Sequence, residues 1–89
     1  MPHELESLIG REVVLDMIPP YVYLGTLVAK DDRFLTLEKA DVHDLRDTST
    51  TRELYILDAK RHGVRPTRDR VFVKLADIIS ISALTDVVE

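Results

Sequence analysis

Apolar and polar residues alternate along an N-terminal and a C-terminal block of the chain, and this alternation most restricts the fold. Side chains of a β-strand point to opposite faces in turn, so a period of two indicates strands with one buried face. Turn and breaker residues divide the blocks into five predicted strands, at 11–17, 21–30, 34–38 with an extension to 42, 71–75 and 78–82. Gly25 inside the second strand predicts a sharp bend or a bulge.

The length of 89 residues allows one domain, spanning 1–89, with a thin core that a partner or further copies would stabilise. Hydrophobic residues at 45% and charged residues at 31% are typical of a folded, soluble protein. The lack of cysteine excludes disulfides and thiolate zinc sites and suits a reducing cytoplasm. No run approaches the roughly 20 apolar residues that span a bilayer, so we expect a cytoplasmic protein without membrane contact.

The segment between the third and fourth predicted strands, 46–70, is far longer than the 4–6 residues of most loops. Thr50 and Glu53 have the spacing of a capping box, and Lys60-Arg61-His62 before Gly63 is typical of a helix C-terminus. We therefore predict a helix at about 51–62, in an appendage that contacts a partner. The run 54–57 also suits a strand, which is the alternative. A shorter helix is predicted at 2–8.

No residue set has the pattern of a catalytic site. The three glycines stand too far apart to build a phosphate-binding loop, and no serine or threonine lies in a nucleophile elbow. Four residues at the end of the third strand have metal-ligand chemistry: Asp41, His43, Asp44 and Asp47. Neighbours in an extended chain rarely converge on one ion, so a solvated strand end is favoured. We expect a binding protein, not an enzyme, with no metal or cofactor.

The net charge of −4 does not by itself predict a nucleic-acid binder. The charges are unevenly placed, however, because residues 60–70 hold a basic stretch with a single acid. Its cations are Lys60, Arg61, Arg65, Arg68 and Arg70. Such a stretch would bind RNA phosphates or a protein partner, and a solvated charged loop is the simpler alternative.

The order of the predicted elements resembles that of the Sm-like (LSm) family. The family's first motif looks like Leu8-Ile9-Gly10-Arg11-Glu12-Val13-Val14, Tyr23-Leu24-Gly25-Thr26-Leu27 and Asp32-Arg33-Phe34-Leu35-Thr36-Leu37. The second motif looks like Val71-Phe72-Val73-Lys74-Leu75-Ala76-Asp77-Ile78. The sequence departs from the family where Leu35-Thr36 replaces the common Met-Asn and where Lys74-Leu75 replaces Arg-Gly.

This resemblance implies a mostly β fold, a small open barrel of five bent antiparallel strands with a short N-terminal helix and a helical insertion. It also implies a homo-oligomeric ring of six or seven copies, in which the fourth strand of one subunit pairs with the fifth strand of the next. The interface residues would be Val71, Val73, Ile79 and Ile81. Elementary physics agrees, since unpaired strand edges expose free N–H and C=O groups and invite association.

The resemblance further implies an RNA site at Asp32, Phe34, Thr36 and Lys74, to which the basic stretch adds Lys60, Arg61 and Arg65. Phe34 would stack on a base, while Thr36 offers a hydroxyl where an amide would read the base edge better. Lys74 is a point charge without the planar fork of arginine. We therefore expect a ring that binds RNA weakly or with relaxed specificity. The alternatives are a ring that scaffolds proteins with a degenerate RNA pocket, a single barrel within a larger complex, and a merely structural Phe34.

Overall fold

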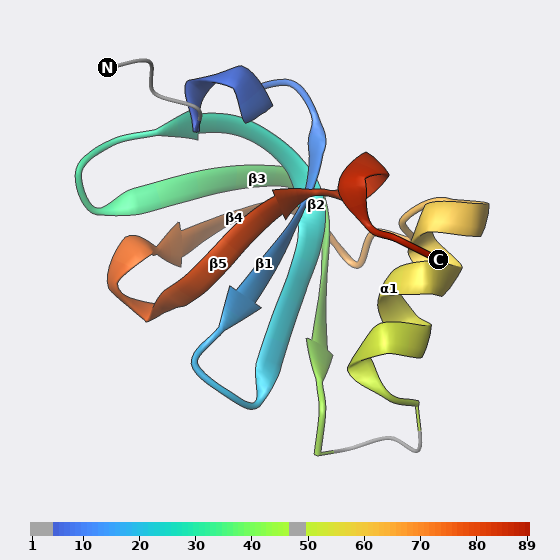
Figure 1. Ribbon diagram of the computed structural model, residues 1–89. Coiled ribbons are helices and arrows are strands. Elements are labelled where there is room, and N and C mark those ends of the chain that lie inside the picture. The colour runs from blue at the N-terminus through green and yellow to red at the C-terminus, as the bar shows by residue number, and fades with distance from the viewer. Residues whose placement is uncertain (1–4, 47–49) are drawn as a thin grey trace.

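The computed structural model describes residues 5–46 and 50–89 and contains one antiparallel sheet of five strands (Figure 1). The strands are β1 (Glu12–Met17), β2 (Tyr21–Lys30), β3 (Phe34–Asp44), β4 (Arg68–Lys74) and β5 (Ile78–Ala83). They lie in the order β4-β3-β2-β1-β5, so β4 and β5 form the two edges. The predicted mostly β fold of five strands is confirmed. β3 is longer than predicted, and β4 begins earlier, at Arg68.

The barrel core lies on the concave side of this bent sheet. It is built from Val13, Leu15 and Met17, which alternate along β1, and from buried residues of the other strands: Leu27, Leu35, Leu37, Ala40 and Val73. β2 and β3 curve strongly over it (Figure 1), and their register shifts at Gly25, between Leu24 and Thr26. The predicted irregularity at Gly25 is confirmed.

A second, smaller core lies on the outward face of the sheet, under the helix α1 (Arg52–His62). Its buried members are Val14, Val22 and Leu24 from the sheet, Ile56 and Ala59 from α1, and Leu84 from the C-terminal tail. The insertion is therefore packed against its own barrel and is not a free appendage. The C-terminal end of the chain lies beside α1 (Figure 1), where the 3-10 helix η3 (Leu84–Asp86) contributes Leu84.

The predicted helix of the insertion is confirmed, and the strand alternative for 54–57 is wrong. The cap differs from the prediction, because Thr51 and not Thr50 precedes the first helical residue. The hydroxyl oxygen of Thr51 accepts from the backbone N–H of Leu54 at 3.2 Å, which satisfies one of the free amides of the first turn. Gly63 ends the helix with a φ of 91°.

Two further 3-10 turns complete the chain, η1 (Glu6–Leu8) and η2 (Leu75–Asp77). η1 lies within the helix predicted at 2–8, of which residues 2–4 lie outside the described part of the chain. Leu5 and Leu8 pack against the barrel core. Among residues 5–46 and 50–89, no helix combines the length and apolar character needed to cross a membrane.

Candidate nucleic-acid interface

The β2–β3 loop and the end of β4 bring three of the predicted site residues together. In the antiparallel register of β3 and β4, Phe34 is opposite Lys74, and Thr36 is opposite Phe72. Directly opposed side chains share one face of a sheet and lie within contact distance of each other. Leu35 and Leu37 point into the core, so Phe34 and Thr36 point outward. Phe34 keeps 36% of its surface exposed, so it does not pack inside the barrel.

The loop that carries Phe34 is fixed by Asp31. One carboxylate oxygen of Asp31 accepts from the backbone N–H groups of Arg33 at 2.7 Å and Phe34 at 2.8 Å. These two backbone hydrogen bonds lower the pKa of the Asp31 carboxyl below its ordinary value. The backbone N–H of Leu75 donates to Arg33 O at 2.8 Å, which ties the loop to the end of β4. Asp32 is exposed in the same loop, beside this ordered turn.

Phe72 is a residue of this face that the sequence analysis passed over. Its side chain is 64% exposed, whereas its neighbour Val73 is only 3% exposed. The alternation along β4 therefore directs Arg70, Phe72 and Lys74 outward. The signal was present in the sequence, but Val71, Phe72 and Val73 are all apolar, so the pattern did not indicate which of them faces the core.

The basic stretch is divided between two elements. Lys60 and Arg61, in the last turn of α1, contact the C-terminal tail. The Lys60 ammonium donates to Val87 O, and Arg61 forms an ion pair with Glu89 at 2.7 Å. Arg70 lies on β4 and pairs with Glu38 of β3, also at 2.7 Å. Arg65 lies exposed in the connection between α1 and β4 and forms no ion pair with any residue in the described ranges.

The predicted interface residues have different surroundings. Val73 is buried in its own barrel, and Val71 and Ile81 pack against that core from the edge strands. Ile79 on β5 is 65% exposed. Of these four side chains, only that of Ile79 is mainly exposed to solvent. The other three would join an interface through the backbone of the strands that carry them.

The acidic end of β3 is occupied by contacts within the chain. Asp41 accepts from the Tyr55 hydroxyl at 2.5 Å and from the Thr67 hydroxyl at 2.7 Å, and the His43 ring stacks on Tyr55 with 4.3 Å between the ring centres. Burial, followed by the hydrogen bond to Asp41, raises the pKa of Tyr55. In the described ranges no group of three or more potential ligands could hold a metal ion, and Asp47 lies outside those ranges.

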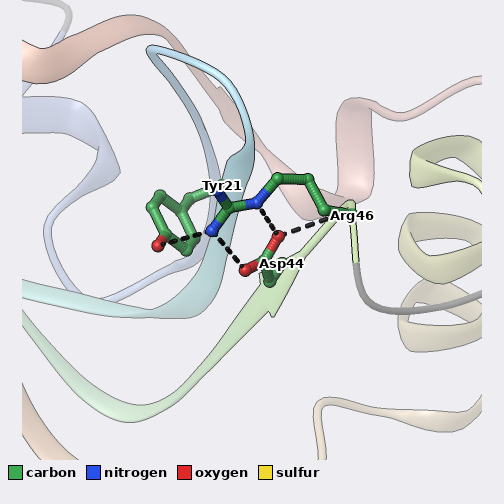
Figure 2. A network of polar contacts seen from close by, with 3 residues as sticks. All are labelled: Tyr21, Asp44 and Arg46. Carbon is green, nitrogen blue, oxygen red and sulfur yellow. Dashed lines mark hydrogen bonds and ion pairs between the residues drawn. The ribbon is translucent and has the colours of Figure 1, made fainter.

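Asp44 belongs to a separate network with Arg46 and Tyr21 (Figure 2). Arg46 donates to both carboxylate oxygens of Asp44, at 2.9 Å from Nη2 and 3.1 Å from Nε, and to the Tyr21 hydroxyl at 3.3 Å. The side-chain hydrogen bond from Arg46, with a second one from its backbone N–H, lowers the pKa of Asp44 to about 2. This network joins the end of β3 to the start of β2, and it presents no vacant carboxylate to a ligand.

No protein-family model and no curated protein matches this sequence. Solved structures, in contrast, match its fold. The Sm protein of Pyrococcus abyssii in complex with a uridine heptamer superposes with a TM-score of 0.63 at 13% identity, over 93% of this chain and 97% of that one. An Sm-like protein of Archaeoglobus fulgidus gives 0.60 at 16% identity, over 93% of each chain.

A chain of the NatC complex bound to CoA gives a TM-score of 0.60 at 18% identity, over 93% of this chain and 87% of that one. At these identities the likeness concerns the backbone fold. The bent five-stranded sheet, the short N-terminal 3-10 turn and the edge positions of β4 and β5 agree with it. This chain therefore has the Sm-like fold.

Proposed function

We propose that this chain forms a homo-oligomeric Sm-like ring in the cytoplasm and binds single-stranded RNA weakly or with relaxed specificity. One observation carries the RNA site: an exposed phenylalanine, Phe34, directly opposite an exposed lysine, Lys74, on the outward face of adjacent strands. An aromatic ring stacks on any base, and a lysine neutralises a phosphate without reading sequence. Thr36 and Asp32 complete the pocket, with a poorer capacity to read a base edge.

The rigidity of the β2–β3 loop supports this assignment. Asp31 holds the backbone of Arg33 and Phe34, so the ring of Phe34 is presented before a ligand arrives. A preorganised side chain loses less conformational freedom on binding than a mobile one. The solved Sm protein with a uridine heptamer, which shares the fold, adds support for an RNA ligand.

The test is a titration of the purified protein with short uridine-rich and adenine-rich RNAs at low and moderate salt. Phe34→Ala should weaken the free energy of RNA binding by about 1–3 kcal/mol per stacked base. It should leave the slope of the logarithm of the binding constant against the logarithm of the salt concentration, the salt slope, nearly unchanged. Replacing Lys60, Arg61 and Arg65 with alanine should weaken binding evenly across sequences and flatten the salt slope. No binding of either RNA at low salt would overturn the RNA assignment.

A scaffold that binds other proteins is the second candidate, and two observations favour it. The fold also matches a chain of the multi-protein NatC complex, and the cations Lys60 and Arg61 are engaged by the tail of this same chain. The absorbance ratio at 260 and 280 nm of the purified protein distinguishes the two. A ratio typical of pure protein, with no RNA binding, would favour the scaffold, and co-purified nucleic acid would favour the RNA ring.

A further inference from the structure

The outward side of β4 has an unusual composition for a strand at the edge of a small barrel. Three side chains share this side, in the order Arg70, Phe72 and Lys74, and Arg68 lies exposed at the start of the strand. The opposite side of the strand carries Val71 and Val73, which pack on or within the core. Packing in this subunit therefore explains the valines but leaves the outward phenylalanine 64% exposed between two cations.

The neighbouring strand β3 extends the same surface. Phe34 is opposite Lys74, Thr36 is opposite Phe72, and Glu38 is opposite Arg70. Phe34 and Phe72 are therefore diagonal neighbours, a relation that lets large aromatic side chains reach each other or grip successive bases. α1 and the tail cover the other part of the outward face, over Val14, Val22 and Leu24, and the aromatic part stays open.

The cations of β4 differ in whether an acidic side chain balances their charge. Arg70 is held by Glu38 in an ion pair of 2.7 Å, so its charge is largely balanced within the chain. Arg68 donates to the hydroxyl of Thr67 at 3.2 Å and forms no ion pair with a residue in 5–46 or 50–89. Lys74 forms no ion pair with any residue of the described chain. Two cations without an ion pair to the described residues thus lie on β4, one on each side of Phe72.

We propose that this outward face of β4 is a second part of the RNA site, with Phe72 as a base-stacking residue. Arg68 and Lys74 contact phosphates on either side of it, and the strand of RNA runs from Phe34 along β4 toward the end of α1. This proposal rests on the proposed RNA-binding function and extends it beyond the loop pocket. Alternating aromatic and cationic side chains along a groove or face are the usual means of holding single strands without sequence selection.

Charge favours RNA over a second copy of the chain as the occupant of this face. The whole chain carries a net charge of −4, yet Phe72 has a cation on each side of it on this face, Arg70 and Lys74, and Arg68 lies exposed at the start of the same strand. The buried centres of protein–protein interfaces are depleted in charged residues, whereas RNA phosphates attract cationic side chains. A neighbouring subunit would pair with the backbone edge of β4. The outward side chains stand roughly perpendicular to the sheet and stay accessible in such a pair.

The experiment compares matched variants in RNA titrations, with the mass of each variant measured by sedimentation. Phe72→Ala should weaken binding of short RNAs about five- to 150-fold, the range for one lost stacked base, and Phe72→Tyr should restore it. Leu54→Ala is the control, because Leu54 on α1 is 59% exposed and apolar but lies outside this face. Arg68→Ala should lower the salt slope by about one ion, and Arg11→Ala should not.

Arg11 is a matched control because its guanidinium also makes a hydrogen bond to a single threonine hydroxyl, that of Thr85 at 2.8 Å. Wild-type protein that binds RNA, with Phe72→Ala binding equally well, would overturn this proposal and leave the loop site standing. A changed mass for Phe72→Ala would also overturn it, since Phe72 would then act in assembly. Wild-type protein that binds no RNA would instead overturn the proposed function itself.

Discussion

Gly25 lies at a close approach of β2 to β3. A Cβ placed on Gly25 would meet the Cβ of Ala40 at 3.0 Å, the Cα of Ala40 at 3.1 Å and the carbonyl oxygen of Glu38 at 3.3 Å. Ala40 is fully buried in the barrel core, so a Cβ on Gly25 would press on packed atoms. We expect Gly25→Ala to lower the free energy of unfolding by about 1–3 kcal/mol, as overpacked cores do. Urea denaturation measures this loss.

The double variant Gly25→Ala with Ala40→Gly is the control for that prediction. It moves the methyl group from one strand to the other, and it should lose less stability than the sum of the two single variants. Additive losses would mean that the close approach of β2 and β3 does not govern the cost.

Asp44 should titrate far below an ordinary aspartate. Its pKa is lowered from 3.8 to about 2 by the hydrogen bonds from Arg46. Because the folded value is the lower one, the resulting stability is present above about pH 4 and is lost as the pH falls toward 2. Arg46→Gln should move the NMR titration midpoint of Asp44 up toward 3.8.

Asp31 is the internal control for this titration, because backbone N–H groups lower its pKa and Arg46 has no part in that. The midpoint of Asp31 should stay the same in the Arg46→Gln variant. An unchanged midpoint for Asp44 in the same variant would show that Arg46 does not hold this carboxylate.

At the scale of elements, α1 is attached to the barrel near its start and to the C-terminal tail near its end. Near its start, Arg52 forms an ion pair with Asp16 of β1 at 2.7 Å, and Tyr55 donates to Asp41 of β3. Near its end, Lys60 and Arg61 contact the C-terminal tail. These contacts join residues far apart in the chain, so no local spacing in the sequence could have indicated them. The existence of the helix was predictable from its caps and last turn, whereas its docking was not.

The N-cap of α1 was predicted at Thr50 and lies at Thr51, and substitutions can distinguish the two positions. Thr51→Ala should lower the free energy of unfolding by about 0.5–2 kcal/mol, because the amide of Leu54 loses its acceptor. Thr51→Ser keeps the hydroxyl oxygen and should retain most of that stability. Urea denaturation of both variants measures the difference. If Glu53→Ala costs more than Thr51→Ala, the capping box predicted at Thr50 is the better description.

At the scale of the whole molecule, the five strands were predictable because alternation records which side chains enter the core. The same principle failed at β4, where three consecutive apolar residues suit either face. Val73 was therefore predicted as an interface side chain although it is buried in its own barrel, and Phe72 was overlooked. The pairing of Phe34 with Lys74 required the register of β3 and β4, which depends on contacts 40 residues apart along the chain.

The two edges of the sheet, on β4 and β5, are unpaired in the part of the chain that the structure describes. β4 and β5 are each bonded to a single strand of the described chain, β3 and β1 respectively. Each edge thus presents backbone N–H and C=O groups that a second copy can pair with. A heterologous contact of this kind closes into a ring when the rotation between copies allows it. We expect sedimentation at micromolar concentration to give one species of several copies, and a strict monomer would contradict the ring.

Ile79→Pro tests that assembly at the β5 edge. The register between β1 and β5 shifts between the pairs Asp16–Ser80 and Met17–Ile78, which leaves Ile79 without an opposite residue on β1. Edge and bulge positions tolerate proline, so the subunit should stay folded, but it loses an N–H that a neighbouring β4 would accept. The sedimentation mass should fall to that of a single chain while the circular dichroism stays that of a folded β protein.

Two variants complete the argument on assembly. Ile79→Thr keeps the N–H and the β-branched shape, so it should retain the mass of the wild-type protein. Val73→Pro should unfold the subunit, because Val73, although on an edge strand, is buried in the barrel core opposite Leu35, and the change also removes its side chain from that core. Assembly and folding can thus be tested separately. Proline at Ile79 on β5 should prevent pairing with a neighbouring subunit, whereas proline at Val73 on β4 should unfold the barrel. A full-size assembly in the Ile79→Pro variant would exclude the β5 edge as the contact between copies.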